Sequence, residues 1–556
     1  METETLTPVK RFWRLLRPDK QEIRNVYIYA IFNGLINLSL PIGIQAIINL
    51  IQGGRISTSW IVLVLFVVSG IVLSGVMQVN QLRLTENLQQ KIFTRAAFEF
   101  AYRIPRIKME KLYKHYAPEL MNRFFDVVSV QKGLSKILID FSTASIQVIF
   151  GLILLSVYHP FFIVFSLILV ALVWLIFRIT FRKGMETSLK ESKSKYRIAH
   201  QLEELARTHI TFKLAGKTNL PMQQIDETGQ EYLGHREGHF LVLVKQYWLM
   251  IGFRAVVAMG LLVIGGILVM EQQMNIGQFV AAEIIILLIM SSVEKIILSL
   301  EGIYDVFTSI EKIGQVTDLE LEDDEGISVE ESCENGGMDI ELKNLCFHYP
   351  DQGINVLSNL NFEIKTGENI LITGDNNSGK STLLYLLAGL YKPCEGYIAY
   401  NNIPLGNYNP ESLRSYIGDC LMDEKLFEGT VMENISMGRA RATTENVQWA
   451  IEKLGLNNFI KELPKGYLTV INPQGQQFSK GIIDRLLLAR AIADKPKVLL
   501  IKDAFTLFSI EERTKILEFL MDKSNPWTLI LASSNPDLGV NMDKVFELVN
   551  GKIINQ

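Results

Sequence analysis

The sequence predicts an α-helical membrane domain with six spans, followed by an α/β domain built around a phosphate-binding loop. Apolar residues make up 48% of the 556-residue chain. They gather before about residue 300, in runs long enough to cross a bilayer, and strand-like and helical patterns alternate after that point. Residues 374–382 read Gly-Asp-Asn-Asn-Ser-Gly-Lys-Ser-Thr, the spacing typical of a loop that binds phosphate.

The overall composition sets limits on function. The formal net charge is only −4, which gives no indication of a nucleic-acid partner. The first 24 residues are basic and amphipathic, and the apolar run after them is too long for a cleavable signal peptide. The four cysteines show no metal-binding spacing and are expected to be reduced cytosolic thiols; they are Cys333, Cys346, Cys394 and Cys420.

The N-terminal stretch, residues 1–24, is predicted to hold a short helix at the membrane interface. A solvated tail is the alternative. The pattern behind the prediction interleaves Phe12, Trp13, Leu15 and Leu16 with Arg11, Arg14 and Arg17.

Six apolar runs then alternate with very short and very long connections. The long connections, residues 80–136 and 182–247, are rich in Lys and Arg and have helical periodicity, whereas Arg55 is the single basic residue in the short ones. The positive-inside rule therefore predicts that the N-terminus, both long loops and the C-terminal domain are cytoplasmic. The expected spans are residues 25–51, 60–79, 137–158, 160–181, 248–270 and 276–300.

Several charged residues fall within these spans. Charges at membrane depth are costly and usually face a cavity or a partner. Arg254 and Glu283 lie well inside their runs and are cavity candidates, Asp140 is expected to snorkel, and Glu294 and Lys295 are expected to pair with neighbouring helices.

The predicted domains follow from these patterns. Residues 25–317 form the six-helix domain with its two long cytoplasmic loops, and residues 338–556 form the α/β domain. Residues 318–337 between them are strongly acidic, which predicts a solvated linker rather than a tail that binds a partner.

The loop at residues 374–382 has the context that its function requires. It follows the strand-like run Ile370–Ile372 and opens a helical pattern, so backbone N–H groups and a helix N-terminus would point at phosphate oxygens. Lys380 would reach the outer phosphates and Ser381 would bind Mg²⁺. The predicted nucleotide-binding residues of the loop are Gly374, Asp375, Asn376, Asn377, Ser378, Gly379, Lys380, Ser381 and Thr382.

Six spans with long cytoplasmic helices, followed by this domain, resemble an ABC exporter half-transporter, and most of all the bacterial type I secretion exporters of peptides and proteins. Those exporters often carry an N-terminal peptidase domain, for which the 24 residues before the first span leave no room. The resemblance implies a chain in the bacterial inner membrane that binds ATP and forms a dimer with a second half-transporter. It also implies a periplasmic adaptor and an outer-membrane channel as partners.

The resemblance also implies roles for residues outside the loop. Tyr349, in Phe-His-Tyr-Pro, matches the aromatic residue that stacks on adenine, although a buried strand tyrosine is the alternative. Asn377 stands where the family usually has Gly, and Asn tolerates a left-handed backbone. Ser479 and Gly481 match the signature motif that serves the opposite chain's nucleotide, whereas Lys480 and Ile482 depart from it.

Four positions have lost the family's usual catalytic groups. Met422 replaces the Q-loop Gln, and a thioether is a poor ligand for Mg²⁺. Lys502 replaces the acid that orders the metal, and it has no acceptor. Asp503 is one methylene shorter than the usual Glu, and Ser534 replaces the switch His; Ser509 also replaces the D-loop Asp. These losses predict a site that binds ATP but has lost hydrolysis.

Alternatives to this interpretation remain open. A one-residue shift of the strand would let Asp503 act as the metal-ordering acid, although its side chains would then change face. A divergent site could also hydrolyse slowly with other groups. Lys502 could replace part of the charge of Mg²⁺ beside the phosphates, or it could pair with an acid.

Three functions follow, of which the first is preferred. It is an ATP-binding exporter subunit that moves a peptide or protein, with its own site impaired in hydrolysis. The others are a non-transporting membrane scaffold or sensor and a slow homodimeric pump. By position, residues 115–122 and 207–217 resemble the tips of the two cytoplasmic loops, which would couple the two domains.

Overall fold

The computed structural model describes residues 7–52, 58–329, 337–421, 424–503, 505 and 508–555. It divides into two compact units. The helical unit comprises residues up to Pro105 and His115–Leu319, and the sheet unit comprises Arg106–Lys114 and the chain from Glu320 onward. Residues 106–114 therefore belong to the second unit, although the sequence placed them in a loop of the membrane domain.

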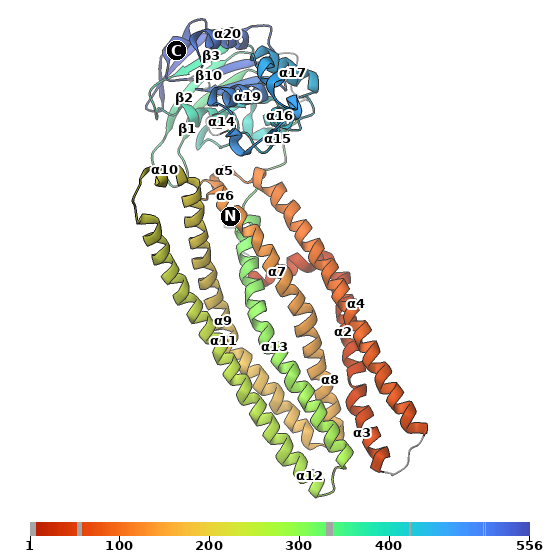
Figure 1. The fold of residues 1–556 in the computed structure, drawn as a ribbon. Helices are drawn as coiled ribbons and strands as arrows, with labels where there is room; N and C mark the ends of the chain where they lie inside the picture. The colour runs from red at the N-terminus through yellow and green to blue at the C-terminus, as the bar shows by residue number, and fades with distance from the viewer. Residues whose placement is uncertain are drawn as a thin grey trace. The chain divides into compact units, whose positions relative to one another are not determined.

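Among its described residues, the helical unit contains six helices that are long and apolar enough to cross a membrane (Figure 1). This confirms the six predicted spans, and the helices extend well past several of them. In order, these helices cover Pro8–Gln52, Thr58–Arg106, Ala117–Tyr158, Phe161–Arg207, Leu220–Met270 and Ile276–Thr317.

The long connections continue the spans as helices, as their periodicity predicts. Helices α4, α9 and α11 have 46, 47 and 41 residues, so each is about 60–70 Å long at 1.5 Å per residue. Helices α9 and α11 lie side by side. The elements of the unit are α1 (Pro8–Leu16), η1 (Arg17–Asp19), α2 (Lys20–Asn37), α3 (Ser39–Gln52), α4 (Thr58–Arg103), η2 (Ile104–Arg106), α6 (Ala117–Met121), η3 (Asn122–Phe125), α7 (Asp126–Ser135), η4 (Lys136–Phe141), α8 (Ser142–Tyr158), α9 (Phe161–Arg207), α10 (His209–Leu214), α11 (Leu220–Gly260), η5 (Leu261–Gly265), α12 (Gly266–Met270) and α13 (Ile276–Thr317).

Helix α13 begins at a capping box. The side chain of Asn275 accepts a hydrogen bond from the Gln278 backbone N–H at 2.7 Å, and the Asn275 backbone N–H donates to the Gln278 side chain at 2.9 Å. These reciprocal bonds satisfy two backbone donors that a helix start leaves open. Residues 271–275 therefore form a short turn between α12 and α13, as the sequence predicts.

The N-terminal helix α1 differs from the predicted interfacial helix in one respect. Phe12 and Leu16 are buried in the helical unit, and the Phe12 ring lies 5.5 Å from that of Phe307 on α13. Arg11 pairs with Glu311 on the same helix and with Asp318, the residue that follows it. The apolar face of α1 is thus covered by protein, while Trp13 stays exposed.

The charges within the spans have different surroundings. Arg254 on α11 forms an ion pair with Glu294 on α13, so the expected pairing of Glu294 with a neighbouring helix is confirmed. Glu283 is half-buried, and Lys295 and Asp140 are exposed. Lys295 makes no ion pair among the described residues, so its expected pairing is not found there.

The sheet unit is an α/β domain with a mainly parallel sheet of six strands in the order β12-β11-β3-β10-β9-β6, of which only β12 is antiparallel to its neighbour. A second, antiparallel sheet has the order β2-β1-β4-β5, and β7 pairs with β8. The strands are β1 (Ile340–Phe347), β2 (Leu357–Ile364), β3 (Asn369–Thr373), β4 (Glu395–Tyr400), β5 (Ile403–Pro404), β6 (Ile417–Cys420), β7 (Gly429–Thr430), β8 (Val470–Ile471), β9 (Val498–Lys502), β10 (Thr528–Ala532), β11 (Lys544–Val549) and β12 (Lys552–Asn555).

The interior residues of the central strands β3, β9 and β10 are apolar because both faces of the parallel sheet are covered. On β9, Leu499 and Ile501 belong to the core with helices α16, α17, α19 and α20, whereas Val498 and Leu500 belong to the core with α14 and the antiparallel sheet. The helices of the unit are α5 (Met109–Leu112), α14 (Lys380–Leu387), η7 (Leu405–Asn407), α15 (Pro410–Ser415), α16 (Val431–Ser436), α17 (Thr444–Lys453), α18 (Asn457–Glu462), η8 (Gly466–Leu468), η9 (Pro473–Gly475), α19 (Lys480–Ile492), α20 (Ile510–Met521) and η10 (Pro536–Gly539).

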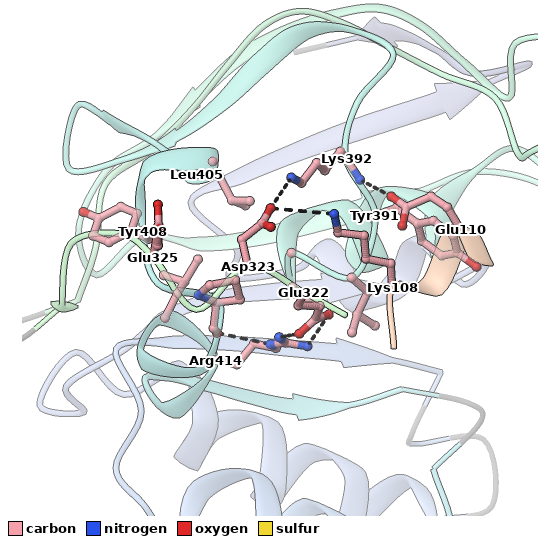
Figure 2. Close-up of a pocket in the computed structure, with 16 residues that line it drawn as sticks. Lys108, Glu110, Glu322, Asp323, Glu325, Tyr391, Lys392, Leu405, Tyr408 and Arg414 are labelled. Atoms are coloured by element: carbon pink, nitrogen blue, oxygen red, sulfur yellow. Dashed lines mark hydrogen bonds and ion pairs between the residues drawn. The ribbon is translucent and has the colours of Figure 1, made fainter. Parts of the chain in front are cut away.

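The described part of the acidic linker is packed on the sheet unit, which corrects the expectation of a solvated segment (Figure 2). Glu322 forms an ion pair with Arg414, and its side chain is only 13% exposed. Asp323 lies 3.4 Å from Lys392 and 3.7 Å from Lys108. The acidic side chains of this segment therefore pair with basic side chains that are distant in the sequence. Residues 330–336 of the predicted linker lie outside the described residues.

Residues 106–114, which we call the docked segment, also belong to this unit. Lys108 pairs with Glu320, and Lys114 pairs with Asp351 at 2.5 Å. The Glu110 carboxylate accepts a hydrogen bond from the Lys392 backbone N–H at 3.1 Å (Figure 2). The sequence placed the tip of the first cytoplasmic loop at residues 115–122. His115 onward belongs to the helical unit, and that assignment stays a prediction.

Candidate functional site

The predicted phosphate-binding loop lies between β3 and α14, as the sequence indicates. Gly374 and Gly379 have φ angles of +145° and +106°, and a Cβ atom on Gly374 would lie 2.2 Å from the Leu548 carbonyl oxygen. Glycine is therefore required at Gly374. Asn377 has a φ of +67°, so the left-handed backbone expected of this Asn is confirmed.

Lys380 begins α14, and its side chain folds back over the loop. Its Nζ donates to the carbonyl oxygens of Gly374 at 2.5 Å and Asp375 at 2.8 Å. Burial lowers the pKa of Lys380, Asp503 opposes this shift and the charge of Lys502 adds to it. Lys380 and Lys502 are thus close enough to interact, and together they make the loop strongly attractive to a polyanion.

An open cleft of about 1140 Å³ connects the loop with the other predicted residues. Its lining includes Asn376 through Thr382, Tyr349, Lys502 and Asp503. The fold therefore brings together residues that the sequence separates by more than 150 positions. A cleft of this kind, lined by both a phosphate loop and an aromatic ring, fits a nucleoside triphosphate.

Tyr349 lies two residues beyond the end of β1 and is half-buried, so it is not the fully buried strand residue of the alternative interpretation. Its hydroxyl shares a hydrogen bond with Thr382 Oγ1 at 3.0 Å. The rings of Phe347 and Tyr391 meet it edge-on, at centroid distances of 5.1 and 5.5 Å. These contacts fix the orientation of the Tyr349 ring beside the loop.

Lys502 is the last residue of β9, and period 2 places it on the same strand face as Val498 and Leu500, toward α14. Asp503 follows with a φ of +46°. Its backbone N–H donates to the Ala532 carbonyl oxygen at 3.1 Å, and its Oδ1 accepts from Ser533 Oγ at 3.1 Å. A lysine therefore stands at the strand end, and the neighbouring carboxylate is held by β10.

The structure says less about two further residues that the sequence places at the site, Ser534 and Met422. Ser534, at the switch position, is exposed just beyond β10. Met422, at the Q-loop position, lies outside the described residues.

Sequence reasoning missed two acids that line the cleft, Asp419 and Glu424. Burial and then the neighbouring Asp419 carboxylate raise the pKa of Glu424 to about 8. Glu424 Oε1 accepts from the Leu421 backbone N–H at 2.7 Å, and Oε2 lies 3.7 Å from Arg490. Both acids lie in the stretch compared with the Q-loop, where the sequence gives no sign that they share one buried site.

Sequence reasoning also missed the contribution of the docked segment. Met109 and Tyr113 line the same cleft as the phosphate loop. Gln352, just after the Phe-His-Tyr-Pro stretch, lines it too. The signal that could have indicated them is the aromatic Tyr113 next to a predicted loop tip.

The signature residues lie at a different surface of the sheet unit. Ser479 is the N-cap of α19 and is exposed, and a Cβ atom on Gly481 would meet no atom within 4 Å. An open helix N-terminus of this kind can accept an anion. Ser509, at the D-loop position, instead caps α20 in a capping box with Glu512.

Mg²⁺ fits these residues poorly. Ser381 lines the cleft, but Lys502 takes the place of an acid. Asp419 and Glu424 interact with each other and with Arg490. Among the described residues, no group of three or more His, Cys, Asp and Glu side chains gathers at a metal site. The cleft thus suits the nucleotide better than the metal ion that usually accompanies it.

Both units of the chain match families of known proteins. Residues 24–293 match the ABC transporter transmembrane region, and residues 357–506 match the ABC transporter family. A solved bacterial Atm1-family ABC exporter with ATP bound has the same fold over 96% of this chain and 94% of its own, with a TM-score of 0.81 and 18% identity. The chain therefore has both parts of an ABC transporter, in the order and with the fold of an ABC exporter half-transporter. Its sheet unit is the ATP-binding domain of that family.

Relatives of this half-transporter include toxin exporters. The leukotoxin translocation ATP-binding protein LktB of Mannheimia glucosida is 31% identical over 294 residues, which are 53% of this chain and 41% of that protein. The corresponding proteins of Mannheimia haemolytica and Bibersteinia trehalosi are 30% identical over the same shares. The similarity therefore spans less than half of the length of these relatives.

Proposed function

We propose that this half-transporter binds ATP at its own phosphate loop without hydrolysing it, and that it drives export as one half of a dimer. The observation on which this rests most is Lys502, at the end of β9 beside an intact phosphate loop. A cation there cannot ligate a metal. Asp503, the nearest carboxylate in sequence, is short and is held by Ser533.

The loss of hydrolysis follows from how phosphoryl transfer is catalysed. Catalysis depends almost entirely on positioned charges around the transferred group. Here the positions of the metal-ordering acid and the switch His hold Lys502 and Ser534, and that of the Q-loop Gln holds Met422. Removing even one positioned group of this kind typically costs 10²–10³ in rate.

The dimer provides a second nucleotide site. The exposed Ser479 and the half-buried Gly481 at the start of α19 would complete a site on the opposite chain. We propose that this chain pairs with a second half-transporter and that hydrolysis, if its motifs are intact, takes place at the partner's loop.

The exported substrate is proposed from the relatives. The names of the similar proteins describe leukotoxin translocation. We therefore propose a peptide or protein as substrate, the bacterial inner membrane as location, and a periplasmic adaptor with an outer-membrane channel as partners. The six apolar helices support a multi-pass membrane location.

Turnover and stoichiometry of the purified full-length chain test the proposal. The expected result in nanodiscs is saturable ATP binding with phosphate release no faster than that of a Lys380→Ala control. Robust ATPase activity of the chain alone would favour a slow homodimeric pump and contradict the impaired site. A chain that binds ATP but never associates with a second half-transporter would favour a scaffold or sensor.

Cross-linking tests the dimer separately. In a chain whose native cysteines are replaced, Ser378→Cys on the phosphate loop and Ser479→Cys on the signature motif should form a disulfide between chains when ATP is present. Each single variant is the matched control. Absence of the cross-link with every candidate partner, including a second copy, would contradict the sandwich arrangement.

A further inference from the structure

An aromatic side chain of the docked segment lies on the ring that is best placed to bind the nucleotide base. Tyr113 stacks on Tyr349 with a centroid distance of 5.2 Å and an interplanar angle of 14°. Both residues line the cleft that contains the phosphate loop. The contact lies wholly within the sheet unit, which includes the docked segment.

Tyr113 is held in this position from two sides. Its hydroxyl accepts a hydrogen bond from Gln352 Nε2 at 2.9 Å, and the next residue, Lys114, pairs with Asp351 at 2.5 Å. Asp351 and Gln352 directly follow the stretch that contains Tyr349. The loop that contains Tyr349 therefore also holds Tyr113 in place through these two contacts.

The stack leaves no room for a base between the two rings. Two aromatic rings at 5.2 Å are already within the range of direct offset stacking. The Tyr349 ring cannot simply turn, because its hydroxyl is bonded to Thr382 and the rings of Phe347 and Tyr391 contact it. Tyr113, in contrast, keeps 42% of its surface exposed, so it can leave without opening a buried cavity.

We propose that Tyr113 occupies the base-stacking face of Tyr349, so that a purine nucleotide binds by displacing Tyr113 and thereby loosens the docked segment. The inference rests on the proposed function, since it needs ATP in this cleft. Any aromatic ring offers a base a stacking surface, so the exchange replaces one stack with another. The chain leads from the docked segment directly into α4 on one side and α6 on the other.

This exchange would give the half-transporter a second route for coupling. In related exporters a Q-loop Gln reports on the nucleotide, and this chain has Met422 there. The Tyr113–Tyr349 contact would respond to binding of the base, and not to the γ-phosphate. The docked segment remains anchored by Lys108 and Glu110 at its other end (Figure 2).

Binding measurements on the full-length chain in nanodiscs test the competition. Tyr113→Ala removes the competing ring, so the Kd for ATP should fall roughly 3- to 10-fold. Tyr113→Phe keeps the ring and should change the Kd by no more than about twofold, because only one hydrogen bond is lost. Tyr116→Ala is the matched control, since Tyr116 is an exposed tyrosine three residues away in the helical unit.

Inorganic tripolyphosphate separates base competition from general loosening of the cleft. It occupies the phosphate loop but has no base, so Tyr113→Ala should leave its Kd unchanged. Hydrogen exchange adds a second readout: the Tyr113 amide, which donates to the Met109 carbonyl oxygen at 2.8 Å, should exchange faster with ATP but not with tripolyphosphate.

The outcomes discriminate between the two levels of proposal. ATP binding that Tyr113→Ala leaves unchanged or weakens would overturn the competition alone. An equal gain for ATP and tripolyphosphate would also overturn it, because the base would then play no part. Absence of ATP binding in both the wild type and Tyr113→Ala would overturn the proposed function together with this inference.

Discussion

At the scale of single residues, Lys502 sets the most direct test of how ATP is held. If its ammonium group replaces part of the metal's charge, chelation of Mg²⁺ should leave the Kd for ATP of the full-length chain within about threefold, since the nearby charge persists without metal. Lys502→Asp should restore dependence on Mg²⁺, with binding weakened at least tenfold by chelator. Isothermal titration with and without EDTA measures both.

The control for Lys502 is an exposed lysine of the same domain. Lys515 on α20 is suitable, because it pairs only with Glu511 in its own helix and is absent from the cleft lining. A wild type that loses ATP affinity on chelation would instead mean that Lys502 serves only to pair with an acid.

Glu424 predicts a dependence of stability on pH. Its pKa is raised from 4.5 to about 8 in the folded protein, so between these values folding takes up a proton. The stability contributed by this group is full below about pH 4.5 and is lost as the pH rises through 8, with a slope of up to about 1.4 kcal/mol per pH unit. The midpoint of thermal unfolding should therefore fall from pH 5 to pH 8 more steeply in the wild type than in Glu424→Gln.

Glu433 offers a control for this experiment. It lies on the next helix, its pKa is lowered, and it caps α16 at the surface. Glu433→Gln should keep the steep wild-type dependence above pH 5. Parallel profiles for the wild type and Glu424→Gln would contradict the raised pKa of Glu424.

At the scale of elements, a buried polar cluster joins three helices of the helical unit. The Tyr196 hydroxyl on α9 donates to Asp126 Oδ2 on α7, and Asp126 Oδ1 accepts from Ser309 on α13 at 3.4 Å. The Arg123 guanidinium lies 3.8 Å above the Tyr196 ring. Asp126 and Arg123 are both buried, so each depends on these contacts.

Tyr196→Phe should therefore destabilise the helical unit. It keeps the ring under Arg123 but leaves the buried Asp126 carboxylate with one donor fewer, at a cost of about 1–3 kcal/mol. A lower midpoint of thermal unfolding in detergent measures the effect. Tyr247→Phe, at an exposed tyrosine on α11, should leave the midpoint unchanged, and equal midpoints for both variants would contradict the prediction.

Much of the fold was predictable at this scale. Each spanning helix follows from an apolar run of sufficient length, and β9 follows from a run that is apolar on both faces because both faces are covered. The packed linker was not predictable. Glu322 meets Arg414 only through tertiary contacts, and an acidic run by itself is typical of a solvated segment.

The candidate site was predictable to a similar extent. The spacing of the phosphate loop predicted Lys380 and Ser381 as nucleotide-binding residues. An ungapped comparison with the family predicted that Lys502 lies at the end of a strand. Tyr113 and the pairing of Asp419 with Glu424 were not accessible, because nothing in local sequence indicates which distant side chains share a cleft. The inclusion of residues 106–114 in the sheet unit was not predictable for the same reason.

At the scale of the whole molecule, installing the family's usual groups at the four divergent positions tests the proposal that their loss prevents hydrolysis by this chain. The variant combines Met422→Gln, Lys502→Asp, Asp503→Glu and Ser534→His. Because these groups act together on one transferred phosphate, single replacements should do little, whereas the combination should raise phosphate release by the purified chain at least tenfold.

Two controls make this result interpretable. Adding Lys380→Ala to the combined variant should abolish the gained activity, which ties it to this phosphate loop. Ser479→Ala should abolish it as well if turnover takes place between two copies, since the signature motif acts on the opposite chain's nucleotide. A combined variant that binds ATP, forms the cross-linked dimer and still releases no phosphate would mean that these four positions are not what prevents hydrolysis.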